Sequence, residues 1–144
     1  MSSSNWNIGQ WGAVAIGVAY VAAGLIGFAV TGFGSFIQDT GYDILGFDVN
    51  PFHNVFHLTV GAYLLLVARL SPTATEGALI GGGLVYLVAA GLGFDGRLQI
   101  LSINDAFAQD QFLHIASGSA ALLLGLVSTL LSRSKRSGDV VQHT

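Results

Sequence analysis

The chain has 144 residues, of which 52% are hydrophobic and only 9% are charged, with 20 glycines and no cysteine. A water-soluble domain normally carries about 25% charged residues, so this chain has too few charges to cover a surface in water. The lack of cysteine excludes disulfides and sulfur-ligated metal sites. Five basic residues and a formal charge of −3 provide no basic patch, so we expect no nucleic-acid partner.

Four nearly uncharged stretches predict four membrane-spanning helices. They cover about 12–33, 51–69, 78–95 and 110–132, and each approaches the roughly 17–25 apolar residues that a helix needs to cross a bilayer. Four such stretches in so short a chain leave too few residues to cover them in water. The predicted fold class is therefore all-α: an integral membrane four-helix bundle over 12–132, in contact with the lipid bilayer.

Residues 1–11 and 133–144 flank this domain. The leading segment lacks the basic region of a signal peptide, and the apolar run after it is too long for one that is cleaved. We expect 1–11 to remain as a cytoplasmic segment, with Trp6 and Trp11 at the membrane interface. The sequence predicts a flexible cytoplasmic tail at 133–144, in which His143 is incidental.

The second predicted helix begins with a cap and a pair of histidines. Asn50-Pro51 combines a favoured N-cap residue with a proline in the first turn. His53 and His57 follow one turn apart on the same helical face. The preceding loop, 34–50, is too apolar for a free linker and is expected at the membrane interface or against a partner.

The third and fourth predicted helices carry a comparable pattern. Glycines 81–83 predict close packing of the third helix. Ser102-x-x-Asp105 predicts a capping box ahead of the fourth helix. Asp110 and His114 then repeat the one-turn spacing of the histidine pair.

The basic residues indicate how the bundle is oriented. Arg69 and the basic residues after the fourth helix, with the acidic loop 34–50, place both termini and the short loop 69–77 in the cytoplasm by the positive-inside rule. The longer loops, 34–50 and 95–111, then face outward, and only Arg97 opposes this assignment. We predict a multi-pass protein of the bacterial inner membrane.

The two predicted hairpins resemble each other in sequence. HNVFHLTVG at 53–61 aligns without gaps to DQFLHIASG at 110–118, and VAYVAAGLIGF at 18–28 resembles LVYLVAAGLGF at 84–94. Each hairpin begins on the same side of the membrane. The alignment therefore predicts two repeated hairpins related by a parallel pseudo-twofold axis along the membrane normal.

The repeat predicts that polar side chains from the second and fourth helices meet near their outer ends. Three imidazoles and one carboxylate would suit zinc, iron or copper. The four candidate ligands are His53, His57, Asp110 and His114. Asn54 and Gln111 are the candidates for orienting these ligands by hydrogen bonds.

Two other interpretations of the same residues stay open. His57 and His114 alone, one from each hairpin, would ligate a haem or another tetrapyrrole from both sides. Gly61 and Gly118 would then leave space for the flat macrocycle. The third interpretation is a hydrogen-bond network that holds the hairpins together, with Asp110 paired to a histidine.

The sequence contains no nucleophile motif, Walker loop or dinucleotide fingerprint, which favours a protein without its own catalysis. The leading hypothesis is a small membrane protein that binds a metal ion or another cofactor. The alternative is an accessory or structural subunit that packs against a larger respiratory or photosynthetic membrane complex, or against another copy of itself. A metal-dependent membrane enzyme is a third option.

The pattern Asn-Pro-x-His-Asn-x-x-His-x-x-x-Gly at 50–61, echoed by Asp110-x-x-x-His114-x-x-x-Gly118, resembles a family of small bacterial four-span membrane proteins. That family is catalogued as domain of unknown function 4383. The resemblance covers about 12–132 and implies a four-span topology, with no activity attached. Gln111 departs from the asparagine expected there, which affects a residue beside the candidate ligands and not a ligand itself.

Overall fold

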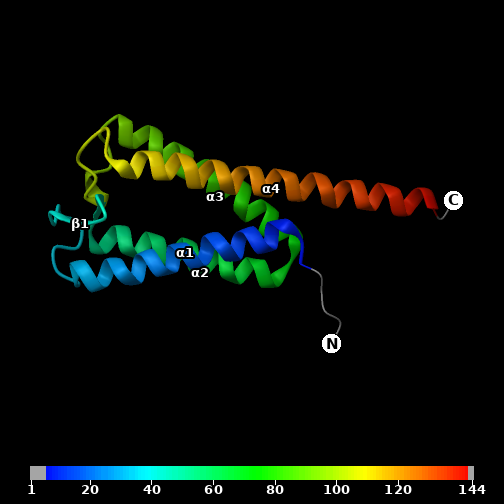
Figure 1. Ribbon diagram of the computed structural model, residues 1–144, viewed down its shortest axis with the longest axis horizontal. Helices are drawn as coiled ribbons and strands as arrows, with labels where there is room; N and C mark the ends of the chain where they lie inside the picture. The colour runs from blue at the N-terminus through cyan, green and yellow to red at the C-terminus, as the bar shows by residue number, and fades with distance from the viewer. Residues whose placement is uncertain (1–5, 143–144) are drawn as a thin grey trace.

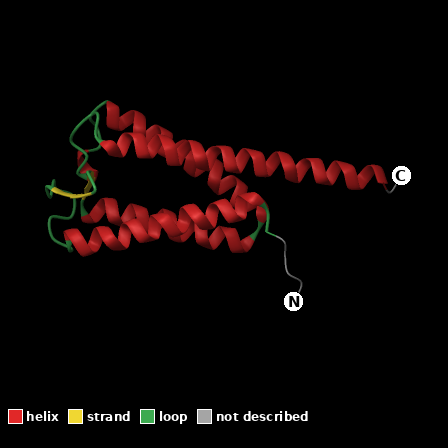
Figure 2. Ribbon diagram, in the orientation of Figure 1, coloured by secondary structure: helices red, strands yellow, loops and turns green. Residues whose placement is uncertain are grey.

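The computed structural model describes residues 6–142 as four long helices with a small pair of strands at one end (Figures 1 and 2). The helices are α1 (Ile8–Thr31), α2 (Pro51–Leu70), α3 (Pro72–Phe94) and α4 (Gln109–Gln142). The antiparallel strands β1 (Tyr42–Ile44) and β2 (Phe47–Val49) lie between α1 and α2, and the short 3₁₀ helix η1 (Gln99–Leu101) lies between α3 and α4. The fold is therefore all-helical apart from this strand pair.

All four helices are long and apolar enough to cross a membrane. Each also presents large apolar side chains on its outer surface, among them Leu25, Leu66, Val88 and Leu130, which are 57–64% exposed. Such a surface is stable against lipid and unstable against water. The predicted multi-pass four-helix membrane bundle is thereby confirmed.

Two helices begin earlier than the sequence predicted. Asn7 caps α1 by accepting from the Gln10 backbone N–H at 2.9 Å, and the Gln10 side chain accepts from the Asn7 N–H at 3.1 Å, which makes a complete capping box. Ser71 is both the C-cap of α2 and the N-cap of α3, and Pro72 lies in the first turn of α3. The predicted loop 69–77 is therefore wrong, because a single residue makes the turn.

Glycines bring the two helices of each hairpin into backbone contact. A Cβ added at Gly17 would lie 2.9 Å from the Gly61 carbonyl oxygen, and one at Gly83 would lie 2.7 Å from the Gly118 carbonyl oxygen. Only glycine leaves room for such a crossing. The hairpin α1–α2 and the hairpin α3–α4 therefore each close around one glycine pair.

A second kind of glycine contact lies nearer the strand end of each hairpin. The Asn54 side chain occupies the space of a missing Cβ at Gly27, and the Gln111 side chain does the same at Gly93. Elsewhere on α3 a Cβ at Gly81 or Gly82 would meet nothing within 4 Å. The prediction of close packing at glycines 81–83 is therefore right for Gly83 and wrong for its two neighbours.

The hairpins contact each other mainly toward the end where α2 turns into α3. Small and aliphatic side chains form the buried core there: Ala13, Leu64, Val67, Ala68, Ala78, Leu79 and Ala121. Beside this core the buried Glu76 carboxylate accepts from Ser128 Oγ and Ser132 Oγ, both at 2.8 Å, and from Asn7 Nδ2 at 3.3 Å. This carboxylate joins α3, α4 and the start of α1.

At the opposite end the two longer loops are joined through buried polar groups. Asn50 caps α2 by accepting from the His53 backbone N–H at 2.8 Å, and its amide donates to the Gln38 and Ile100 carbonyls. Ser102 has a left-handed φ of 68° after η1 and donates to Asp39, so the predicted Ser102 capping box does not form. The Ser102 hydroxyl is used between loops instead of at a helix start.

The fourth helix continues beyond the bundle (Figure 1). The sequence predicted a flexible tail at 133–144, but α4 extends to Gln142. Residues 143–144, including His143, lie outside the described part. The helical register simply continues, because no proline interrupts it after the apolar span.

Candidate functional site

Five ring side chains from all four helices meet between the two hairpins, and we call them the ring cluster. Its members are Tyr20 of α1, His53 and His57 of α2, Tyr86 of α3 and His114 of α4. Tyr20 stacks on Tyr86 with ring centroids 5.1 Å apart, and each tyrosine contacts one histidine at 5.3–5.4 Å. The three histidines predicted from sequence are therefore brought together.

His53 joins the ring cluster to the strand pair. Its ring centroid lies 4.6 Å from that of His57 and 6.3 Å from that of His114. Its Nδ1 lies 2.9 Å from the Asp48 carbonyl oxygen, and because a carbonyl only accepts, Nδ1 carries the proton in this bond. His53 is thus bonded to the strand pair through the Asp48 carbonyl.

Asp110, the predicted carboxylate ligand, is engaged by the same strand residue. Its Oδ2 accepts from the Asp48 backbone N–H at 3.0 Å, and the side chain is buried. Asp48 therefore uses its N–H for α4 and its carbonyl for α2. This pair of bonds fits the network interpretation, although the partner of Asp110 is a backbone amide and not a histidine.

Asn54 and Gln111, predicted to orient the histidines, donate hydrogen bonds to other groups. Asn54 Nδ2 donates to Thr31 Oγ1 of α1 at 3.0 Å, and Gln111 Nε2 donates to the Asp105 carbonyl at 3.3 Å. Both amides sit in the glycine contacts described above. They fasten each hairpin internally, so their expected role beside the ligands is not what the geometry supports.

His114 carries a ring nitrogen that is buried without a hydrogen-bond partner among the described residues. The residue is 5% exposed, and the unpaired atom is its Nδ1. An unpaired buried nitrogen costs roughly 1–3 kcal/mol. A ligand or a water molecule that bonds to this atom would remove that cost.

The geometry of the ring cluster does not favour either a metal ion or a macrocycle as its ligand. Within the part of the chain that the structure describes, no group of three or more histidine or acidic side chains is placed to hold a metal ion. The metal site predicted at His53, His57, Asp110 and His114 is therefore without structural support. The space beside Gly61 and Gly118, where a macrocycle was expected to fit, is also occupied. The Gly17 carbonyl oxygen fills it at Gly61, and the Gly83 carbonyl oxygen fills it at Gly118.

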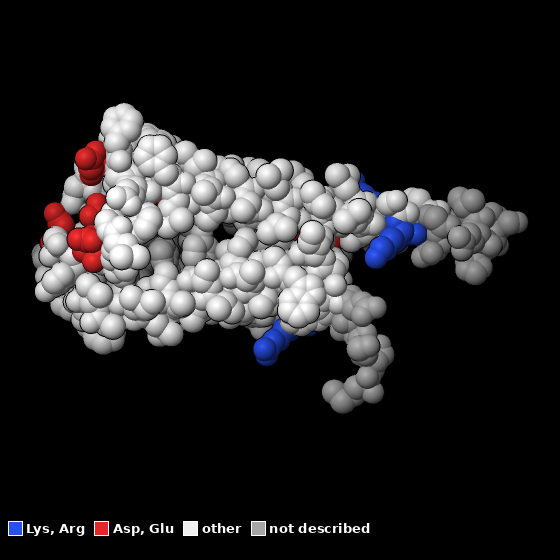
Figure 3. Space-filling model, viewed as in Figure 1, with Lys and Arg blue, Asp and Glu red and all other residues white. Residues whose placement is uncertain are grey.

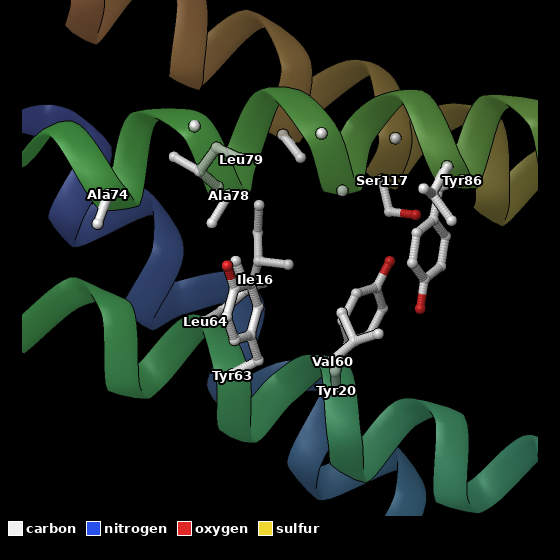
Figure 4. Close-up of a pocket in the computed structure, with 16 residues that line it drawn as sticks. Ile16, Tyr20, Val60, Tyr63, Leu64, Ala74, Ala78, Leu79, Tyr86 and Ser117 are labelled. Carbon is white, nitrogen blue, oxygen red and sulfur yellow. The ribbon is translucent and has the colours of Figure 1, made fainter.

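A cavity of about 520 Å³ adjoins the ring cluster between the hairpins (Figure 4). Its sixteen lining residues come from all four helices, and none is charged. The hydroxyl groups of Tyr20, Tyr86 and Ser117 lie at one end of it, and Ala74 lies at the other (Figure 4). Volumes of roughly 300–1,000 Å³ are typical of small-molecule sites.

The sequence did not identify this cavity or the role of the two tyrosines. The resemblance of 18–28 to 84–94 matches Tyr20 with Tyr86, but it does not show what the two rings contact. That equivalence was the available signal, because matched residues of two hairpins meet at the axis between them. Which histidine each ring would contact depended on helix rotation, which periodicity alone does not define.

Most of the charged residues divide between the two ends of the bundle (Figure 3), with Arg97 at the strand end and the buried Glu76 at the opposite end as exceptions. Asp39, Asp43, Asp48 and Asp105 belong to the loops at the strand end, whereas Arg69, Arg133 and Lys135 lie at the opposite end. Burial, followed by the nearby carboxylates of Asp39, Asp43 and Asp105, raises the pKa of Asp48. The strand end is therefore an acidic surface.

Four membrane-spanning helices around a cluster of imidazole and phenol rings define a small multi-pass membrane protein of the helical-bundle class. The chain belongs to the family described as "Domain of unknown function (DUF4383)", whose family model matches residues 10–127. The resemblance drawn from the histidine motif is thereby confirmed. No curated protein and no solved structure matches the chain.

Proposed function

We propose that this protein is a non-catalytic binding protein of the membrane, which holds a small ligand or cofactor at the ring cluster. The observation that carries the proposal is the buried, unpaired Nδ1 of His114, whose ring contacts Tyr86, a residue that lines the cavity. The large majority of buried polar side-chain atoms in native proteins have a hydrogen-bond partner, and a bound ligand would supply one for this nitrogen. An organic ligand fits better than a metal ion, because two of the predicted metal ligands are bonded to the Asp48 backbone.

The proposal is tested by replacing the imidazoles with phenyl rings, which keep the ring contacts and remove the nitrogens. We expect the detergent-purified protein to carry a stoichiometric ligand, and His57→Phe and His114→Phe each to lose it while keeping their helical circular dichroism. His143→Phe, outside the described residues, is the matched control and is expected to keep the ligand. Elemental analysis, absorption spectra and mass spectrometry of organic extracts identify what is bound.

Two outcomes would contradict the proposal. One is a native protein that is free of metal, chromophore and extracted small molecules. The other is a ligand that both phenylalanine variants retain at native stoichiometry. A folded, ligand-free protein would direct attention to the second candidate function.

The second candidate is an accessory subunit that packs against a larger membrane complex. It is favoured by apolar side chains that stand out of the loops at the strand end: Phe33, Leu45 and Phe107 are 74–88% exposed. Leu45 lies in the turn between β1 and β2 with a left-handed φ of 58°, where a large apolar residue has no local advantage. A protein partner would bury these side chains.

We also propose that the two hairpins are structural repeats. The glycine crossing Gly17–Gly61 has its counterpart in Gly83–Gly118. The amide-filled glycine contacts form a second such pair, and Tyr20 and Tyr86 form a third. These matched contacts support the pseudo-twofold axis predicted from sequence, with the ring cluster lying on it.

The proposed location is the bacterial inner membrane, with both termini in the cytoplasm and the acidic strand end outside. The separation of acidic and basic residues in Figure 3 supports it. The chain has no cysteine, so single-cysteine variants report topology without background. In intact spheroplasts we expect a membrane-impermeant maleimide to label Asp43→Cys and not Ser134→Cys. The reverse labelling would invert the assignment.

A further inference from the structure

The cavity beside the ring cluster has an opening toward the surrounding lipid. Tyr63 of α2 and Val85 of α3 line it and are 53% and 62% exposed, so the cavity is reached from the side between these two helices. The space-filling view shows a hollow between the two hairpins (Figure 3). A molecule dissolved in the bilayer can therefore enter without crossing a loop.

The polar end of the cavity lies deep in the membrane. Tyr20 is near the middle of α1, and the other end of the cavity, at Ala74 and Gly77, is near the start of α3. An ordinary phospholipid keeps its charged head at the membrane surface, because a charge near the bilayer centre costs several kcal/mol. No charged residue lines the cavity to compensate for such a head.

Glycines on α3 keep this space open. Gly82 lines the cavity, and a Cβ there would meet nothing within 4 Å. Glycine lowers helix stability by roughly 1 kcal/mol relative to alanine, so its presence beside empty space is not explained by packing. A bound molecule would fill that space.

We infer that the cavity binds a neutral, membrane-soluble ring compound of the isoprenoid quinone class. Its apolar body would lie along Leu64, Ala78 and Leu79, and its carbonyl oxygens would accept from the hydroxyl groups of Tyr20 and Tyr86. The rings of Tyr20 and Tyr86 stack on each other, which holds both hydroxyl groups at the same end of the cavity. The inference rests on the proposed function and names its ligand.

The test uses the full-length protein in detergent and decylubiquinone as the probe, with bound molecules counted by native mass spectrometry. We expect one quinone per protein, with affinity reduced about tenfold or more by Gly82→Leu, because its side chain occupies the cavity. Gly91→Leu is the matched control on the same helix: Gly91 also has open space around its Cβ position but does not line the cavity. Tyr20→Phe is expected to reduce affinity about fivefold by loss of one hydrogen bond.

Phosphatidylglycerol and hexadecanol are the comparison ligands. Equal or tighter binding of either one, lost in Gly82→Leu, would overturn the quinone assignment. Absence of saturable quinone binding, or identical binding by the two leucine variants, would overturn the cavity as well. If the protein then still carries a ligand that His57→Phe and His114→Phe lose, the proposed function stands and only this inference fails; otherwise both fail.

Discussion

Replacing Gly83 with leucine is expected to lower the free energy of unfolding by about 3 kcal/mol, the upper end of the usual cost of overpacking. A Cβ at this position would lie 2.7 Å from both the Gly118 carbonyl oxygen and the Leu122 backbone nitrogen. Backbone atoms cannot rotate away as a flexible side chain can, so α3 and α4 would have to separate. The loss is measured by thermal unfolding in detergent, followed by circular dichroism.

Gly91→Leu is the control for this prediction. It makes the same substitution on the same helix, at a position where a Cβ meets nothing within 4 Å. Since leucine has the higher helix propensity, Gly91→Leu should be neutral or slightly stabilising. Equal stability of the two variants would show that the α3–α4 crossing is not as close as described.

Replacing Asn50 with alanine is expected to cost about 3 kcal/mol, because the residue serves three partners at once. Its side-chain oxygen caps α2, and its amide donates to the Gln38 carbonyl at 3.2 Å and the Ile100 carbonyl at 3.0 Å. Asn50 is fully buried, so water does not replace these bonds. Unfolding in denaturant measures the loss, and hydrogen exchange should quicken in both loops.

Ser71→Ala provides the comparison for Asn50. Ser71 also caps a helix, by accepting from the Ala74 backbone N–H at 3.0 Å, but it makes this bond at an exposed position. Its loss should cost only about 1 kcal/mol. If the two alanine variants were equally stable, the connection between the loops through the Asn50 amide would contribute nothing, contrary to the argument above.

The sequence identified the features that depend on local chemistry or on composition. The four helices follow from long apolar runs, and the start of α2 follows from Asn50-Pro51, since a cap and a proline act within one turn. The same rule would have found the single-residue turn at Ser71-Pro72. Hydropathy does not mark this turn, because a helix in a membrane protein extends past its apolar part.

The tertiary structure decided which polar groups face one another. The alignment of the hairpins brought His53, His57 and His114 to one region, and they do meet there. It could not show that the Asp48 backbone would take up both His53 and Asp110, because that contact depends on a strand pair whose register is defined by a turn at Leu45-Gly46. Hydrogen bonds between segments that are distant in the chain leave no periodic pattern in the sequence.

The sequence likewise did not show which neighbours each glycine packs against. Gly83 and Gly82 are neighbours in the chain, yet one is packed against a backbone carbonyl and the other borders a cavity. Adjacent helical residues point about 100° apart, so they belong to different surroundings once the partner helix is in place. The sequence by itself determined that this protein is a four-helix membrane bundle with paired histidines. Only the packing of the hairpins decided that these histidines join two tyrosines beside an open cavity, because such a space exists only between helices.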